Sequence, residues 1–498
     1  MKKDMEPAVE TMDTATLCAQ AGKDFPAETR IRAMSMLCVT AKKAAGRREI
    51  ENAEGIHDAL ADALSAEEPK LRKNAARLMG ALGNPCDAAP LGRALGQETT
   101  RFVVPSILLA LGSIGREEAL ATVRAYEVPQ STAPEEEKHC AEIAEAYQKA
   151  MSLLEPREVP MIHSLNAPRT VLLVHPQGFT DVLLQELAGA GIPAKAVSAG
   201  VMVKVQDLDK LYKIRTFFEA LLPCSVTRLD AAEIAAAART GWGCFSLADA
   251  AGCPALPYRV EMKDAGDDRL PLIHAVTAAV GGTNDPSHYS FEIRVRCLTD
   301  GRAAVYVKPC TVRDVRFNYR LGKLPASIHP VTAAAIARAA VEMLGQGEKT
   351  LRAYDPCCGS GTMLVEEAKA HAGRSVLMGT DISQEAVRIA EGNLSAACCH
   401  GTVLRKDCVR FEARNPFDLV ISNLPFGNRV GTHESITPVY HGLVRKLPAL
   451  VRPGGLAVLY TMEGKLLEKE IASARLRVEK VVRTDAGGLF PRAYFIRF

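Results

Sequence analysis

The residues best suited to chemistry in this chain lie in short turns that follow strand-like runs near its C-terminal end. One turn reads DPCCGSGT, residues 355–362, and opens a helix-like stretch. Gly359 and Gly361 allow the backbone to turn tightly and to approach a ligand closely, as in nucleotide-binding βα units. Asp381 ends the next strand-like run and can accept both ribose hydroxyls of an adenosine, and Asp407 ends the third, within reach of an adenine amine. Together these residues predict a cofactor that contains adenosine.

The glycine turn also favours one such cofactor. The third glycine of a dinucleotide-binding GxGxxG turn would fall at Leu364. Asp355 would repel a pyrophosphate, whereas it could hold the ammonium of a methionyl group. The sequence therefore predicts S-adenosylmethionine, bound by Asp355, Cys357, Gly359, Gly361, Thr362, Asp381, Ile382, Asp407, Cys408 and Asn423. The alternative is an ordinary turn whose aspartates cap helices.

A second turn reads SNLPFG, residues 422–427, after a fourth strand-like run. An exocyclic amine is a poor nucleophile because its lone pair is delocalised into the ring. The side-chain oxygen of Asn423 and the carbonyl of Leu424 could accept its hydrogens, while Pro425 stiffens the turn and Phe426 stacks on a flipped base. The turn has no cysteine, which disfavours methylation of pyrimidine carbon 5 through a thiolate. These four residues predict amino-group methylation, unless Asn423 only caps the turn and Phe426 only packs in the core.

The motifs DPCCGSG, GTDIS and SNLPFG, preceded by LPASIHPVTAAAIARAA at residues 324–340, resemble the THUMP-linked guanine-N2 RNA methyltransferases. That family includes transfer-RNA enzymes and a bacterial ribosomal-RNA enzyme. The resemblance covers roughly Thr170 to Phe498 and implies that Ser327 and His329 help to close over the cofactor. Leu424 replaces the first proline of the family's acceptor motif, and His329 replaces an asparagine.

The resemblance implies methyl transfer to guanine N2 in transfer or ribosomal RNA. Adenine-N6 methylation of DNA or RNA needs the same two acceptors and stays open, as does methylation of protein glutamine. A catalytically silent RNA-binding scaffold is a further alternative.

A basic segment with interleaved aromatic residues precedes the C-terminal motifs. Basic and aromatic side chains of this kind can hold RNA phosphates and stack an unpaired base. The expected RNA contacts are Lys308, Arg313, Arg316, Phe317, Tyr319, Arg320 and, beyond the acceptor turn, Arg429. A solvated linker strand is the alternative.

Residues 319–498 are expected to form a doubly wound α/β domain of Rossmann-like type, a class I methyltransferase with a seven-stranded sheet. Helix-like stretches lie between the first five strands, and the last two strands are too close for a crossover, so they should form an antiparallel hairpin. The expected strands are 351–355, 376–381, 402–407, 418–423, 455–461, 478–484 and 494–498.

Residues 157–318 alternate strand and helix patterns and predict two small α+β units rather than one large sheet. Strands are expected at 170–175, 201–205 and 258–262, helices at 180–188, 208–222 and 273–280, and a hairpin pairs 291–295 with 304–307. The resemblance implies a ferredoxin-like unit followed by a THUMP-like, RNA-binding one.

Residues 1–156 read as successive helices. Two stretches, 70–83 and 101–115, look alike, and the start of a third occurs at Arg30. Repeats of this length are typical of an α-solenoid similar to HEAT repeats, although a helical bundle is an alternative. We hypothesise that this segment binds a protein partner or extends the RNA-binding surface.

The overall composition predicts a cytoplasmic protein. Apolar residues make up 48% and charged residues 24% of the 498 residues, which suits several globular cores. No signal-peptide pattern and no long apolar run is visible, so no membrane partner is expected. The 14 cysteines lack CxxC spacing, which favours reduced thiols and no metal site.

Overall fold

The protein is described by a computed structural model that covers residues 13–42, 44–129, 134–155, 161–245, 254, 256–266, 269–286, 289–345, 347, 349–426, 433–485 and 488–498. The chain divides into two compact units, Met1–Glu158 and Val159–Phe498. We call these the N-terminal unit and the second unit.

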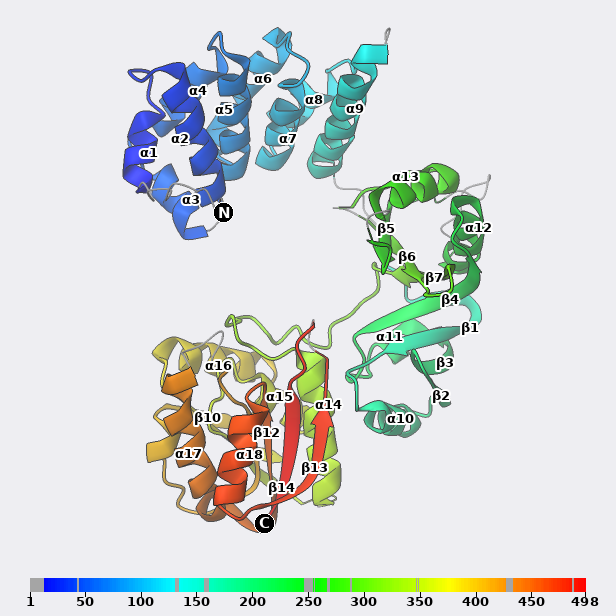
Figure 1. Cartoon of the computed structure of the whole chain (residues 1–498), viewed down its shortest axis with the longest axis vertical. Coiled ribbons are helices and arrows are strands. Elements are labelled where there is room, and N and C mark those ends of the chain that lie inside the picture. Colours follow the sequence, from blue (N-terminus) through cyan, green and yellow to red (C-terminus); the bar gives the residue numbers. More distant parts are fainter. Residues whose placement is uncertain are drawn as a thin grey trace, which may run out of the picture. The chain divides into compact units, whose positions relative to one another are not determined.

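The N-terminal unit is helical in its described residues (Figure 1). Four of its helices, α2, α5, α7 and α9, pack in a row, and α1, α4, α6 and α8 each cover the neighbouring member of that row. The helices are α1 (Thr14–Gln20), α2 (Ala27–Thr40), α3 (Ala44–Glu51), α4 (Ile56–Leu64), α5 (Pro69–Leu82), α6 (Ala88–Gln97), α7 (Val104–Ile114), α8 (Glu117–Arg124) and α9 (Pro134–Leu154).

The second unit contains two seven-stranded sheets. The first sheet has the strand order β2-β3-β1-β4-β7-β6-β5. Its strands are β1 (Ser164–Val174), β2 (Ala194–Val197), β3 (Gly200–Asp207), β4 (Glu219–Arg228), β5 (Tyr258–Lys263), β6 (Phe291–Cys297) and β7 (Arg302–Pro309). Helices α10 (Thr180–Gly189), α12 (Ala231–Trp242) and α13 (Arg269–Val280) pack against its strands.

The expectation that this region lacks one large sheet was wrong, because its strands form a single seven-stranded sheet. One strand, β4, belongs to both halves of a continuous sheet. Its start pairs with β1, as in Leu172 with Leu221, and the rest pairs with β7, as in Val226 with Ala304. The register shifts between Pro223 and Ser225, and such a bulge lets a strand bend and continue.

The helix expected at 208–222 was also wrong. Only Leu208–Leu211 is helical, as α11, and residues 219–222 begin β4. The predicted hairpin was confirmed, because β6 and β7 pair antiparallel with Ile293 opposite Val307.

The second sheet has the order β10-β9-β8-β11-β12-β14-β13. Neighbouring strands from β10 to β12 are parallel, and β14 runs antiparallel to both β12 and β13. The strands are β8 (Leu351–Asp355), β9 (Ser375–Asp381), β10 (Gly401–Arg405), β11 (Phe417–Asn423), β12 (Val451–Thr461), β13 (Arg477–Arg483) and β14 (Arg492–Arg497). The predicted doubly wound α/β sheet and its edge hairpin were therefore confirmed.

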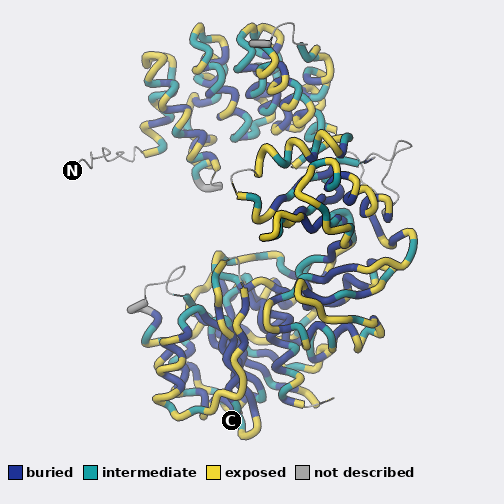
Figure 2. Tube along the Cα trace, turned by 45° about the vertical axis from the view of Figure 1, so that its right-hand side comes forward, coloured by how far each residue is buried: buried dark blue, intermediate teal, exposed yellow. Residues whose placement is uncertain are grey.

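Helices cover both faces of the second sheet, and its central strands are buried (Figure 2). One face packs on α14 (Pro330–Leu344), α15 (Thr362–Ala370) and α16 (Gln384–Ala396), and the other on α17 (His433–Leu450) and α18 (Gly464–Ser473). The expectation that each gap between the first five strands holds a helix fails once. Between β10 and β11 the described chain has only the 3₁₀ turn Cys408–Arg410.

Buried ion pairs join the two sheets of the second unit. Arg215, just before β4, makes two 2.8 Å hydrogen bonds to Glu366 on α15, and Tyr319 donates to the same carboxylate at 2.6 Å. Glu186 on α10 accepts from Arg338 on α14 at 3.0 Å. These contacts fix the position of the first sheet relative to the second.

In the part of the chain that the structure describes, no helix combines the length and the apolar character needed to cross a membrane.

Candidate active site

The glycine turn connects β8 to α15 at the carboxyl edge of the second sheet. Gly359 and Gly361 have φ angles of 53° and 75°, in the left-handed region that glycine tolerates best. A Cβ on Gly361 would lie 3.2 Å from the Ala390 side chain of α16, so the turn is closely packed as well. Thr362, the first residue of α15, is buried, and its hydroxyl lies 3.1 Å from that of Ser360.

Asp355 is a buried carboxylate at the start of this turn. Its Oδ1 accepts from the Cys357 backbone N–H at 3.0 Å and from the Ser422 hydroxyl at 2.6 Å. Burial, and then the negative charge of Asp381, raise the pKa of Asp355 to about 7. A cationic ligand would compensate this buried charge.

Asp381 and Asp407 follow the two adjacent parallel strands. Asp381 accepts from the backbone N–H groups of Gly359 at 3.0 Å and Ser383 at 2.9 Å, which ties the β9 end to the glycine turn. Asp407 accepts from the Val409 N–H at 2.9 Å. Beside Asp381, the Ile382 side chain is 72% exposed, so an apolar surface is available to a flat ring.

The thiols of Cys357 and Cys408 interact with each other near these turns. A hydrogen bond with the thiol of Cys408, together with burial, raises the pKa of Cys357 above its usual value. The structure thus brings the expected cofactor residues of the glycine turn, β9 and β10 to one edge of the sheet.

The acceptor turn begins at Asn423, the last residue of β11. The Asn423 amide nitrogen donates to the Ala326 carbonyl at 3.3 Å. Its Oδ1 atom is buried and has no hydrogen-bond partner among the described residues. Because buried polar atoms are nearly always paired, this oxygen is a site where a ligand donor would be accepted.

The rest of the acceptor turn is held by neighbouring strands and helices. The Leu424 N–H donates to the Tyr460 carbonyl at 2.9 Å, and the Tyr440 hydroxyl donates to the Pro425 carbonyl at 3.0 Å. The Phe426 ring is half-buried, with its centroid 6.4 Å from that of Tyr460. Arg429 lies outside the described residues.

The segment before α14 contacts both turns. Ser327 lies 3.0 Å from the Ser360 hydroxyl of the glycine turn, and its neighbour Ala326 accepts from Asn423. His329 caps α14, with its Nδ1 accepting from the Val331 N–H at 3.2 Å. Residues 326–327 therefore lie between the glycine turn and the acceptor turn and contact both.

Sequence reasoning missed Asn393 on α16. Its amide donates to the Ser360 carbonyl at 2.8 Å and to the Gly322 carbonyl at 3.0 Å, and its Oδ1 accepts from the Gly322 N–H. Asn393 thus fixes the glycine turn against the linker. Its signal is an amide on the apolar face of a predicted helix.

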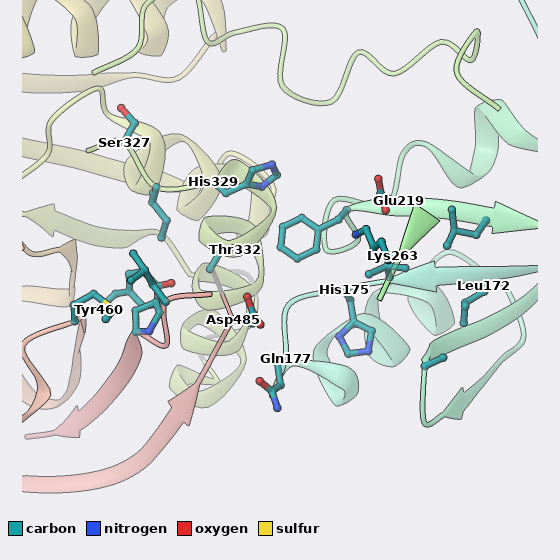
Figure 3. Close-up of a pocket in the computed structure, with 18 of the residues that line it drawn as sticks. Leu172, His175, Gln177, Glu219, Lys263, Ser327, His329, Thr332, Tyr460 and Asp485 are labelled. Atoms are coloured by element: carbon teal, nitrogen blue, oxygen red, sulfur yellow. The ribbon is translucent and has the colours of Figure 1, made fainter. Parts of the chain in front are cut away.

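A cleft of about 810 Å³ lies next to the acceptor turn, between the two sheets of the second unit (Figure 3). Asn423, Phe426 and Tyr460 line one side, whereas the aspartates of the cofactor turns are not part of its wall. Figure 3 shows His329 and Thr332 on one side of the cleft and Glu219, Lys263 and Leu172 on the other.

The opposite wall is the face of the first sheet that points away from the core formed with α12 and α13. Successive strand residues alternate between faces. Val305 and Val307 pack in the core under the helices, whereas Tyr306 between them lines the cleft. The same alternation places Leu221 and Arg294 on the cleft wall. Sequence reasoning missed this wall because strand pairing brings it together.

The expected RNA-contacting residues lie in different surroundings. Arg316 is buried and donates to Asp314 and to the Ile214 and Phe217 carbonyls. Tyr319 is buried against Glu366. Arg316 therefore fixes the linker to the segment before β4, and Tyr319 fixes it to α15.

The other members of that set differ in exposure. Arg313 is exposed, Phe317 is half-buried beneath the Arg215 guanidinium, and Lys308 pairs with Glu219 at 2.8 Å. Arg320 is half-buried, and its Nε atom lacks a hydrogen-bond acceptor within the described ranges.

Residues 318–492 match the family described as RMKL-like, methyltransferase domain. The matched residues contain both the glycine turn and the acceptor turn.

Two curated relatives share sequence with the chain. A tRNA (guanine(6)-N2)-methyltransferase of Thermus thermophilus is 29% identical over 207 residues, which are 41% of this chain and 60% of that protein. The tRNA (guanine(6)-N(2))-methyltransferase THUMP3 of Mus musculus is 27% identical over 160 residues, 29% of this chain and 32% of that protein. The chain thus spans less than two thirds of the length of these relatives.

Solved structures show a similar fold. TrmN from Thermus thermophilus matches with a TM-score of 0.51 and 22% identity, covering 66% of this chain and 99% of its own. SMU.472, a putative methyltransferase complexed with SAH, matches with a TM-score of 0.51 and 15% identity, covering 66% and 98%.

Proposed function

We propose that this protein is an S-adenosylmethionine-dependent RNA methyltransferase that acts on guanine N2, with transfer RNA as the favoured substrate and ribosomal RNA as the alternative. The observation that carries this proposal is the buried Oδ1 of Asn423, which has no hydrogen-bond partner within the described ranges and whose residue lines the cleft. An exocyclic amine would supply the missing donor. The names of the curated relatives support guanine N2 and transfer RNA.

The chemistry of the glycine turn fits S-adenosylmethionine, which supplies an electrophilic methyl group when bound. Asp355 would hold its ammonium, Asp381 its ribose hydroxyls and Asp407 its adenine amine, with Ile382 against the adenine ring. The buried and raised-pKa carboxylate of Asp355 supports a cationic ligand. The cofactor turn would be completed by Cys357, Gly359, Gly361, Thr362 and Cys408, and Ser327 and His329 would close over the cofactor from the α14 side.

The acceptor turn would position the target amine. Asn423 Oδ1 accepts one amine hydrogen and the Leu424 carbonyl the other, which localises the nitrogen lone pair toward the methyl group. Pro425 keeps the turn rigid and Phe426 stacks on the base. Asn423 and Leu424 would hold the amine nitrogen toward the methyl group that S-adenosylmethionine supplies, and the proton released from the amine would pass to water. Positioning of the two reactants accounts for most of the rate.

We further infer that Arg313, Arg320, Lys308 and Arg429 bind RNA phosphates and that Phe317 contributes an aromatic contact. Arg320 is best supported, because a phosphate would satisfy its buried Nε. Arg316 and Tyr319 would act indirectly, by holding the sheets of the second unit together.

We assign residues 1–156 to a HEAT-like repeat domain, 157–318 to a ferredoxin-like and THUMP-like RNA-binding region, and 319–498 to the methyltransferase domain. The name of the mouse relative supports the THUMP assignment. The continuous first sheet would join the ferredoxin-like and THUMP-like parts through β4.

Repeated contacts support the HEAT-like assignment. A Cβ on Gly80 of α5 would lie 2.8 Å from Cα of Ala110 on α7, and a Cβ on Gly112 of α7 would lie 2.8 Å from Cα of Ala150 on α9. Neighbouring helices of the row α5, α7 and α9 thus approach each other closely at equivalent glycines.

Ion pairs repeat in the same way. In each of three successive repeats an arginine forms an ion pair with a carboxylate of the following repeat. The pairs are Arg30 with Asp62, Arg72 with Glu98 and Arg101 with Glu136. We infer that such an extended surface binds a protein partner.

The free thiols of the described cysteines support the cytoplasmic location that we expect.

The test is methyl transfer from labelled S-adenosylmethionine to transfer RNA and ribosomal RNA from cells that lack the gene. We expect label in the transfer-RNA pool with the full chain, and at least 100-fold slower labelling with Asn423→Ala. Bound cofactor with no label in either RNA would contradict the proposed function.

A further inference from the structure

The cleft is larger than the acceptor turn requires. Its volume of about 810 Å³ lies near the upper end of the roughly 300–1,000 Å³ typical of pockets that bury a whole small ligand. The Asn423 and Phe426 end would hold only the target base. The remaining space lies between α14 and the open face of the first sheet (Figure 3).

An aromatic corner lies in that second part of the cleft. Phe218, just before β4, and His329, at the start of α14, pack with ring centroids 4.9 Å apart and planes at 71°. Both residues line the cleft, and Phe218 is half-buried. A base lying flat on one ring stays edge-on to the other, an arrangement that aromatic groups prefer.

His329 also presents a fixed hydrogen-bond donor. Burial of the His329 ring, and then the positive charges of Arg320 and Arg316, lower the pKa of His329 to about 4. The ring is therefore neutral near pH 7. Its Nδ1 accepts from the Val331 N–H and therefore carries no proton. The proton is on Nε2, where a base carbonyl or ring nitrogen could accept it.

Cations lie at the edge of the same wall. Lys263 and Arg296 line the cleft and are exposed. Arg296 pairs with Asp264 at 3.3 Å, but both side chains are 62% exposed, so a phosphate could compete for this weak pair.

From this combination of an aromatic corner, a fixed N–H donor and cations at the rim, we propose that Phe218 and His329 form a second nucleotide subsite. It holds an unpaired base adjacent to the target guanine, and it rests on the function proposed above. Stacking of a base on an aromatic ring is tolerant of sequence, so the subsite selects for an unstacked strand rather than for one base.

The experiment compares Phe218→Leu with Phe218→Trp in the full chain, because leucine keeps the apolar packing without an aromatic face. The probe is transfer RNA from cells lacking the gene. Phe25→Leu is the matched control, since Phe25 is an exposed phenylalanine of the N-terminal unit. We expect Phe218→Leu to raise KM for RNA by roughly 10- to 100-fold with kcat within a few-fold, and Phe218→Trp to stay near wild type.

An unchanged KM in Phe218→Leu, or an equal loss in Phe218→Trp, would overturn the subsite. Filter binding of the same RNA separates this proposal from the proposed reaction. If wild type transfers no methyl group but Phe218→Leu still weakens RNA binding relative to Phe25→Leu, the subsite stands and the reaction is wrong.

Discussion

Two turns at neighbouring strand ends of the second sheet differ in how their polar groups are satisfied. At the end of β8, the carboxylate of Asp355 is buried and receives two hydrogen bonds, and the negative charge of Asp381 adds to the effect of burial on its pKa. At the end of β11, the Asn423 amide nitrogen donates to the Ala326 carbonyl, but its side-chain oxygen has no partner in the described part of the chain. The Ser422 hydroxyl connects the turns directly through Asp355.

This difference indicates two ways of preparing a site. The glycine turn is already organised and carries a charge that favours a cation. The acceptor turn keeps a buried acceptor unpaired, at a cost of about 1–3 kcal/mol that the surrounding packing must offset. A substrate amine regains that free energy only when it is correctly placed.

The largest effect should follow from removing the unpaired oxygen. Asn423→Ala should lower kcat for methyl transfer by at least 100-fold, since one preorganised polar contact is worth about that factor. Isothermal titration should show cofactor affinity within a few-fold of wild type. Asn423→Asp keeps an acceptor oxygen and should recover part of kcat. Equal rates in wild type and Asn423→Ala would contradict the role of the acceptor turn.

A smaller effect, on binding rather than on turnover, is expected from the glycine turn. Asp355→Asn removes a charge but keeps the shape, so the Kd for S-adenosylmethionine should rise roughly 10- to 100-fold. Thermal unfolding of the ligand-free variant above pH 7 should occur at or above the wild-type Tm, because a buried charge is gone. A clear fall in that Tm would mean that the charge stabilises the empty protein.

The pKa of Asp355 gives a third test. Its folded value of about 7 exceeds the ordinary 3.8, so the folded protein retains a proton that the unfolded chain releases. Stability of the ligand-free protein should therefore fall as pH rises between those values. Cofactor affinity should change in the opposite direction, weakening by up to about tenfold per unit as pH falls below 7. In Asp355→Asn this dependence should disappear.

The smallest effect on cofactor binding should come from a change in the segment that contacts both turns. Ser327→Ala loses the 3.0 Å contact with Ser360 and should weaken cofactor binding by about fivefold, in line with one neutral hydrogen bond. Ser106→Ala, a buried serine of the N-terminal unit, is the control. A larger loss of kcat than of affinity would place Ser327 on the acceptor side instead.

The sequence predicts the two turns better than it predicts the cleft. The strands around Asp355 and Asn423 follow local apolar patterns, and these were confirmed. Residues 208–222 have helical spacing, yet Leu221 and Leu222 belong to β4, because pairing with β1 and β7 outweighs local preference.

The cleft wall could not be predicted for a similar reason. Phe218 and His329 are far apart in sequence, and tertiary contacts such as the Arg215–Glu366 pair bring them together. Asn393 was missed because nothing in its own helix indicates that Ser360 is its partner.

The most direct measurement is nucleoside mass spectrometry of transfer RNA after incubation with the full chain and S-adenosylmethionine carrying a deuterated methyl group. We predict deuterated N2-methylguanosine in RNA from cells lacking the gene, and at least 100-fold less with Asn423→Ala. Deuterated N6-methyladenosine, or label found only in protein, would contradict guanine N2 as the acceptor.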